Sequence, residues 1–319
     1  MPRPPDKVSA VRPLRPGGTV GVVAPASAPA NESDLEAGLA RLRNAGFNVV
    51  TAFDMDKRDG YLADSDSDRL HYLNEMLARD DIAALFCARG GFGALRILSG
   101  IDFNSLRRAP KIIVGYSDIT AIHLAALAQT GLPGLSAAMV STDWKDIATD
   151  EEKAILACLA GTAADGVFAP DGLALTAERS GEAEGRSIGG NLSVLCKLVG
   201  SRYFPDPTDA ILFIEEVGEP PYRIDGLLAQ LHLSGVLDRI GGLVIGGITD
   251  AEPPDGKPSL MLDDILNHYF DLVDGPVASG LSYGHFQPKV PMPVGTRMRL
   301  NVRGETARLV ALEQLVPIA

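Results

Sequence analysis

The sequence is poor in cysteine and has no long apolar run. Its three cysteines, Cys87, Cys158 and Cys196, lack CxxC spacing, so they predict neither a disulfide framework nor a zinc site. We expect all three to be buried as small hydrophobic residues. No run reaches the roughly 18 apolar residues that span a bilayer. The N-terminal segment MPRPPDKVSAVRPLRPGG also has no apolar core of the kind found in secretory signals. We therefore expect a cytoplasmic protein without a membrane anchor.

Basic residues are also in short supply. The chain has 29 Lys and Arg against 41 Asp and Glu, which gives a formal net charge of -12. Proteins that bind nucleic acids usually present clustered Lys and Arg to the phosphates, so we expect no nucleic-acid partner. Hydrophobic residues make up 46% of the 319 positions, which is enough to fill one large core or two ordinary ones.

Short apolar runs alternate with amphipathic stretches from about Gly18, which predicts an α/β fold with helices packed on a mostly parallel sheet. We expect strands over 19–23, 47–51, 82–87 and 111–114, and helices over 32–44, 65–78 and 118–129. The pattern fades between 161 and 185, where Gly, Ala, Asp and Pro dominate. The sequence therefore predicts an N-terminal domain over 1–163, a linker over 164–184 and a C-terminal domain over 185–319. In the last we expect helices over 189–200, 222–237 and 262–269, and strands over 210–218 and 240–248.

The segment KIIVGYSDIT places Ser117 at the turn between a predicted strand and a predicted helix. A serine in such a turn is lifted above the sheet edge, where backbone N–H groups and the helix dipole can stabilise an anion. The segment is not GxSxG, because Ile119 stands at the position of the second glycine. The alternative is that Ser117 or Asp118 simply caps the helix, and the local sequence alone favours the cap.

A nucleophilic serine needs a base, and the chain has five histidines. Four of them fall in predicted helices. Among these, His123 lies six residues beyond Ser117 and points roughly 120° away around the helix axis, so we expect it to be a packing residue. His285 follows an apolar segment and leads into a Pro-containing loop, which makes it the candidate base. The alternative is a loop histidine that is exposed by chance.

An acid is needed to orient the base, and the run AILFIEEVGEPP supplies Glu215 and Glu216 at the end of a predicted strand. Side chains alternate along a strand, so only one of the two can face His285. We prefer Glu215 and keep Glu216 as the second choice. The alternative is that both are solvated acids at a strand edge.

A glycine-rich loop, CARGGFGALRIL, follows the third predicted strand. Its glycines Gly90, Gly91 and Gly93 would let backbone N–H groups approach a ligand oxygen closely. The loop matches neither GxGxxG nor a P-loop, so it does not predict a nucleotide site.

Taken in order, six segments resemble the LD-carboxypeptidase, or muramoyltetrapeptide carboxypeptidase, family from about Gly17 to Arg303. They read VAPAS, RGGFGALR, GYSDIT, GGNLSVL, LFIEEVGEPPYRID and GHFQPKVPMPVG. The resemblance implies Ser117 as nucleophile, Glu215 as acid and His285 as base, with oxyanion donors at the backbone N–H groups of Asp118 and Gly91. It also implies a homodimer whose N-terminal domain resembles class I glutamine amidotransferases and whose smaller C-terminal domain is β-rich.

The implied activity is hydrolysis of the L,D-peptide bond before the terminal D-alanine of murein tetrapeptide, without a metal or organic cofactor. Arg89 and Arg223 are candidates for binding substrate carboxylates, because guanidinium pairs with them bidentately. Two alternatives stay open. One is a self-immunity peptidase of the microcin C type, which resembles the same family and acts on peptidyl or aminoacyl nucleotides. The other is a noncatalytic protein that binds a small anion at the glycine loop.

The chain departs from the family pattern at Phe92, where a tyrosine is usual, at Glu216, where an aspartate is usual, and in one stretch after the nucleophile helix. The family often has an HGP-type segment there, whereas this chain has GLSAAMVS near Leu135. If that stretch lines the substrate pocket, we expect an altered specificity.

Overall fold

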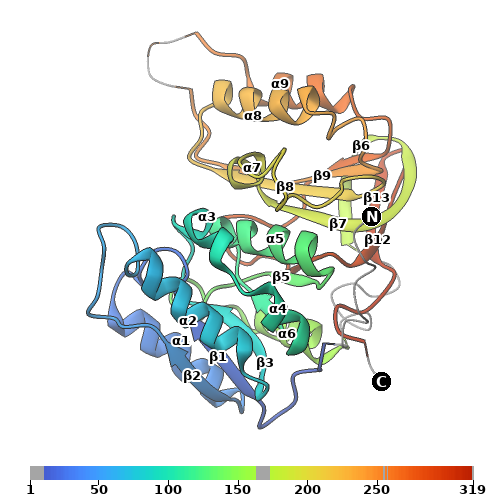
Figure 1. Cartoon of the computed structure of the whole chain (residues 1–319). Helices are drawn as coiled ribbons and strands as arrows, with labels where there is room; N and C mark the ends of the chain where they lie inside the picture. The colour runs from blue at the N-terminus through green and yellow to red at the C-terminus, as the bar shows by residue number, and fades with distance from the viewer. Residues whose placement is uncertain (1–10, 163–172, 254–255, 257, 318–319) are drawn as a thin grey trace, which may run out of the picture.

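The computed structural model describes residues 11–162, 173–253, 256 and 258–317. The chain forms two stacked lobes, with the N-terminal sheet and its helices in one and a β-barrel with three helices in the other (Figure 1). Within the described ranges, no helix has both the length and the apolar character needed to span a membrane.

The N-terminal lobe is built on a six-stranded sheet in the order β11-β5-β4-β3-β1-β2. Five of its strands are parallel and come from the first half of the chain, and β11 joins β5 in the antiparallel sense. The predicted strands of this lobe are confirmed, with ends that differ by at most one residue. The strands are β1 (Thr19–Val23), β2 (Asn48–Ala52), β3 (Ile82–Cys87), β4 (Ile112–Val114), β5 (Gly134–Ser136) and β11 (Met292–Val294).

Helices of the N-terminal lobe begin where side chains can cap them. Asn31 accepts a hydrogen bond from the Asp34 backbone N–H, and Ser65 does the same for Asp68, so both helices start at the expected positions. The helix expected from Asp118 instead follows a short 3₁₀ turn, η2 (Ser117–Ile119). The helices are α1 (Glu32–Asn44), α2 (Asp66–Ala78), α3 (Ala94–Ile97), α4 (Phe103–Arg108), α5 (Thr120–Thr130) and α6 (Thr149–Ala160), and the 3₁₀ turn η1 (Leu98–Gly100) follows α3.

The C-terminal lobe is a closed barrel in the order β10-β6-β13-β12-β7-β8-β9. Closure gives every strand of the barrel a neighbour on both sides, and α8 and α9 cover one side of the barrel (Figure 1). The strands are β6 (Leu173–Arg179), β7 (Gly181–Asn191), β8 (Ile211–Val217), β9 (Gly242–Thr249), β10 (Val277–Ser279), β12 (Arg297–Arg303) and β13 (Thr306–Ala311). The helices are α7 (Leu192–Cys196), α8 (Pro221–Leu233) and α9 (Leu262–Phe270).

Two expectations for the C-terminal half need correction. The described part of the predicted linker, 173–184, consists mainly of β6 and the start of β7, which pair with β13 and β12 in the barrel. Half-buried strands with few large apolar residues carry little hydrophobic signal. The helix expected over 189–200 is confined to Leu192–Cys196, because Gly189 and Gly190 have positive φ and belong to strand β7, which continues to Asn191. A Cβ on Gly190 would lie 2.3 Å from Thr120 Oγ1, so this glycine permits close packing of the two lobes.

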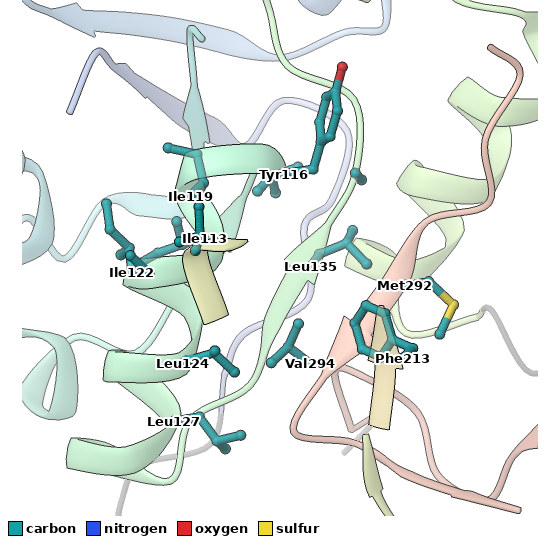
Figure 2. Close-up of a cluster of buried hydrophobic side chains, with 14 of the residues drawn as sticks. Ile113, Tyr116, Ile119, Ile122, Leu124, Leu127, Leu135, Phe213, Met292 and Val294 are labelled. Carbon is teal, nitrogen blue, oxygen red and sulfur yellow. The ribbon is translucent and has the colours of Figure 1, made fainter. Parts of the chain in front are cut away.

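Strand β11 ties the C-terminal chain to the N-terminal sheet. Met292 and Val294 of β11 pack beside Leu135 of β5, and Phe213 of the barrel lies next to them (Figure 2). All four side chains are buried and belong to one continuous hydrophobic core. Within the stretch GLSAAMVS, Leu135 therefore lies in the sheet and in the hydrophobic core. The two lobes share a core where they meet, so the groups on either side of this junction have defined positions.

Candidate active site

Ser117 begins the 3₁₀ turn η2, three residues after the end of the buried strand β4. Its backbone has a φ of 62°, in the left-handed region that residues with a Cβ rarely adopt. No side chain makes a capping hydrogen bond at the start of η2 or of α5. The Asp118 carboxylate instead accepts a hydrogen bond of 2.7 Å from the Ala94 N–H. Neither residue therefore serves the capping role that the local sequence favours for α5.

A chain of hydrogen bonds links Ser117 to two residues of the C-terminal half. The Ser117 hydroxyl lies 3.0 Å from His285 Nε2, and His285 Nδ1 lies 2.8 Å from Glu215 Oε2. The Glu215 side chain is fully buried, whereas the His285 side chain is 20% exposed. A buried carboxylate on Nδ1 fixes the tautomer that leaves Nε2 free to accept the serine proton. This arrangement can activate a hydroxyl for attack on a carbonyl.

The choice between the two glutamates is settled by the strand on which they lie. Alternation along β8 directs Glu215 to His285 and Glu216 to the start of α7. Glu216 accepts hydrogen bonds from the Asn191 side chain at 2.9 Å and from the Ser193 backbone N–H at 2.7 Å. Burial raises the pKa of Glu216. Glu216 thus anchors a helix and does not contact the histidine.

The glycine loop between β3 and α3 lies directly against the serine. A Cβ on Gly90 would be 2.9 Å from the Ser117 Cβ, and a Cβ on Gly91 would be 2.4 Å from Ser27 Oγ. Gly91 also has a φ of 93°. The next residue, Phe92, donates its backbone N–H to Ser27 Oγ at 3.1 Å. Within the described ranges, no protein group accepts a hydrogen bond from the Gly91 N–H.

Asp118 joins the serine turn to this glycine loop. Its carboxylate reaches the first residue of α3, Ala94, which directly follows the loop. The side chain is almost fully buried, and burial raises the pKa of this carboxyl. One residue therefore links two backbone segments that border the Ser117 hydroxyl.

The two arginines considered for substrate carboxylates lie in different settings. Arg89 is partly buried and donates to the Ala28 carbonyl at 2.9 Å. Arg223 is exposed on α8, 3.5 Å from Glu219, and lines a pocket of about 430 Å³ with Lys197 and Tyr222. The geometry does not bring the two arginines together.

The residues expected to have packing roles lie away from the serine hydroxyl. His123 is buried in α5, where its Nε2 lies 3.0 Å from the Ile113 carbonyl, and burial lowers its pKa to about 4. Cys87, Cys158 and Cys196 are free and buried, as predicted. Among the residues that the structure describes, no group of His, Cys, Asp and Glu is arranged to hold a metal ion.

Sequence reasoning missed a polar cluster behind His285. Asp143 accepts hydrogen bonds from Gln287 at 3.0 Å and from Lys289 at 2.8 Å, and Tyr116 donates to the same oxygen at 3.3 Å. Gln287 and Lys289 stand in the GHFQPK segment beside His285, so their place in the chain was a usable signal. Asp143 has no such signal, because it is remote in sequence.

Comparison with known proteins assigns both halves of the chain to one family. The LD-carboxypeptidase N-terminal domain model matches residues 20–137, and the LD-carboxypeptidase C-terminal domain model matches residues 184–300. A Bacillus subtilis (strain 168) protein named "Probable murein peptide carboxypeptidase" is 36% identical over 305 residues, 93% of each chain. A Microcin C7 self-immunity protein of Escherichia coli is 26% identical over 321 residues, 91% of this chain and 92% of its own.

A solved structure has the same fold over nearly the whole chain. The crystal structure of muramoyltetrapeptide carboxypeptidase from Oxalobacter formigenes superposes with a TM-score of 0.79 at 27% identity, covering 91% of this chain and 97% of that one. With both family models matched in order and this likeness throughout, the chain belongs to the LD-carboxypeptidase family.

Proposed function

We propose that this protein is a serine carboxypeptidase that hydrolyses the L,D-peptide bond before the terminal D-alanine of murein tetrapeptide. The single observation that carries the proposal is the hydrogen-bonded series from Ser117 through His285 to Glu215. The names of the relatives from Bacillus subtilis and Oxalobacter formigenes supply the substrate class. No metal or organic cofactor takes part in the proposed reaction.

In the proposed reaction His285 Nε2 takes the proton of the Ser117 hydroxyl while the serine oxygen attacks the carbonyl carbon. Glu215 stabilises the imidazolium that forms. The protonated His285 then gives the proton to the departing amine, so D-alanine leaves and an acyl-serine remains. A water molecule, deprotonated by the same imidazole, releases the shortened peptide and restores the serine.

The proposed oxyanion hole consists of the backbone N–H groups of Asp118 and Gly91. Asp118 immediately follows the nucleophile, and Gly90 of the glycine loop packs against the Ser117 side chain. The absence of an acceptor for the Gly91 N–H among the described residues supports this role. Such donors stabilise the charge that develops on the carbonyl oxygen in the transition state.

Substrate carboxylates are proposed to bind Arg223 and Arg89. Arg223 is the better supported of the two, because it is exposed and lines a pocket beside Lys197. Arg89 already donates to a backbone carbonyl, so its guanidinium has a structural contact as well. We also propose, from the family resemblance, a cytoplasmic homodimer whose N-terminal lobe is related to class I glutamine amidotransferases.

The test is the release of D-alanine from murein tetrapeptide by the wild-type protein and by Ser117→Ala. We expect steady release by the wild type and loss of at least about 10³-fold in the variant, because the nucleophile is gone. Equal rates in the two proteins would refute the proposal. Good ligand binding by both without any release would favour the noncatalytic alternative.

The microcin C-type alternative is tested in the same preparation. Incubation with an aminoacyl sulfamoyl adenylate and with murein tetrapeptide compares kcat/KM for the two substrates. We expect the tetrapeptide to be preferred. A preference for the nucleotide substrate that Ser117→Ala abolishes would keep the serine mechanism and replace the substrate.

A further inference from the structure

The segment that carries His285 is fastened to the lobe that carries the nucleophile. On the basis of the proposed function, we propose that Lys289 and Asp143 are positioning residues that hold His285 against Ser117. Neither side chain reaches the serine hydroxyl or the Nε2 atom, so neither is a catalytic residue.

Lys289 and Asp143 form an ion pair inside the protein. Their charged atoms are 2.8 Å apart, and the side chains are 1% and 4% exposed. The same Asp143 oxygen accepts from the Gln287 side chain, so two residues of the His285 loop meet one carboxylate. The other Asp143 oxygen accepts from the Met139 backbone N–H at 2.8 Å, which fixes the acid to the N-terminal lobe.

Tyr116 connects this ion pair to the proposed catalytic groups. The Lys289 ammonium lies 4.4 Å from the centre of the Tyr116 ring, and that ring packs edge-to-face with the His285 imidazole at a centroid distance of 5.1 Å. Burial raises the pKa of Tyr116, so its phenol keeps its proton and donates to Asp143. Tyr116 directly precedes Ser117. The ion pair of Lys289 and Asp143 therefore fixes the Tyr116 ring, which lies between this ion pair and the His285 imidazole.

Further contacts hold both ends of the loop. The Lys289 backbone N–H donates to Glu151 of α6 at 3.1 Å, and Tyr283 Oη lies 2.6 Å from Ser136 Oγ of β5. Strand β11 then pairs with β5. These contacts place the loop on the N-terminal lobe, and the ion pair is the part that contacts Tyr116 beside the imidazole. A buried ion pair adds little net stability compared with apolar packing, so a geometric role accounts for it better than a stabilising one.

The first test compares Lys289→Met with Lys111→Met as a matched control. Lys111 is equally buried, but its ammonium binds the Leu77 and Ala109 carbonyls at the other end of β4. We expect Lys289→Met to lower kcat for D-alanine release by about 30- to 100-fold with little change in KM, because small misplacement of a base slows the chemical step. Lys111→Met should lose stability and keep kcat. Wild-type kcat in Lys289→Met, or a matching loss in Lys111→Met, would overturn the proposal.

A second variant covers the case in which Lys289→Met does not fold. The double variant Lys289→Met with Asp143→Asn removes both charges and keeps an acceptor for the Met139 N–H. We expect a melting temperature close to that of the wild type, since no unpaired charge is left buried. We expect the kcat of the double variant to remain at least about tenfold below that of the wild type. A folded double variant with wild-type kcat would overturn the proposal.

A double-mutant cycle separates positioning from general structural damage. If Lys289 acts through the imidazole, Lys289→Met should cause no further loss of residual D-alanine release in a His285→Ala background. A further loss by the same factor as in the wild type would overturn the proposal. Unchanged D-alanine release in Ser117→Ala and His285→Ala would instead refute the proposed function. Loss in those two variants with normal kcat in Lys289→Met and in the double variant would refute the positioning role alone.

Discussion

Replacement of Ser117 by glycine should stabilise the protein relative to replacement by alanine. The serine has a φ of 62°, and the left-handed region costs a residue with a Cβ about 1–2 kcal/mol. Glycine has no such cost. Its greater freedom in the unfolded chain offsets about 0.5–1 kcal/mol of the gain. With the middle of each range, the free energy of unfolding of Ser117→Gly should therefore exceed that of Ser117→Ala by about 0.75 kcal/mol.

Comparison of these two variants isolates the backbone strain. Both lose the hydroxyl that lies 3.0 Å from His285, so this loss cancels in the difference. Both should also lack D-alanine release. A gain in stability that accompanies the loss of activity would mean that the nucleophile is held in a strained conformation by its surroundings.

Equilibrium urea unfolding followed by tryptophan fluorescence provides the assay. Trp144 is the single tryptophan of the chain and is buried in the N-terminal lobe against Phe86, with ring centroids 5.5 Å apart. The signal therefore reports the lobe that contains residue 117. Equal stability of the two variants, or a less stable glycine variant, would contradict the reasoning.

Three further predictions follow from contacts around the site. Glu215→Gln should lower kcat by about 10³-fold or more, because a neutral amide no longer stabilises the imidazolium. Glu216→Gln should keep most of the activity. Initial rates of D-alanine release compare the two variants, and equal losses would refute the assignment of Glu215 as the acid. Gly91→Ala should lower kcat by about 10²-fold. The added Cβ would lie 2.4 Å from the Ser27 hydroxyl and would displace the loop that carries the Gly91 N–H. Gly46→Ala is the control, with a similar φ of 92° and open space around it, and an equal loss of kcat there would contradict the prediction. Burial raises the pKa of Asp118, so this carboxyl binds a proton more tightly in the folded state, and its contribution to stability falls as the pH rises from the unfolded pKa through the folded one. Asparagine does not titrate, so the stability of Asp118→Asn relative to the wild type should increase as the pH rises from about 4. Urea unfolding at several pH values measures this difference in the free energy of unfolding. A difference that does not change with pH would contradict the prediction.

Local patterns predicted the N-terminal lobe well. Strands β1 and β3 are buried apolar runs, and α1 begins at an Asn cap and presents a buried apolar face. In such elements the residues that determine the structure are neighbours in sequence. The barrel was harder, because β6 and the first part of β7 alternate half-buried with exposed residues and owe their conformation to partners far along the chain.

The local sequence narrowed the candidate site to a few residues but did not decide the role of each. Alternation showed that Glu215 and Glu216 face opposite ways, but the direction of each depends on how β8 sits in the closed barrel. Likewise, a serine after a buried strand predicts a cap or a nucleophile. The position of His285, 168 residues away, favours the second over the first.

By itself, the sequence determined the α/β architecture of the N-terminal lobe, the strand-turn-helix around Ser117 and the glycine-rich loop after the third strand. These features depend on hydrophobic period, backbone freedom and contacts between near neighbours. Only the tertiary structure decided which glutamate meets His285 and which residues hold that histidine. Lys289 and Asp143 are separated by 146 residues, and their ion pair forms because β11 and the loop before it return to the N-terminal sheet. No local pattern carries the information for such a contact, because the two side chains meet only when the folded chain brings residues 146 positions apart together.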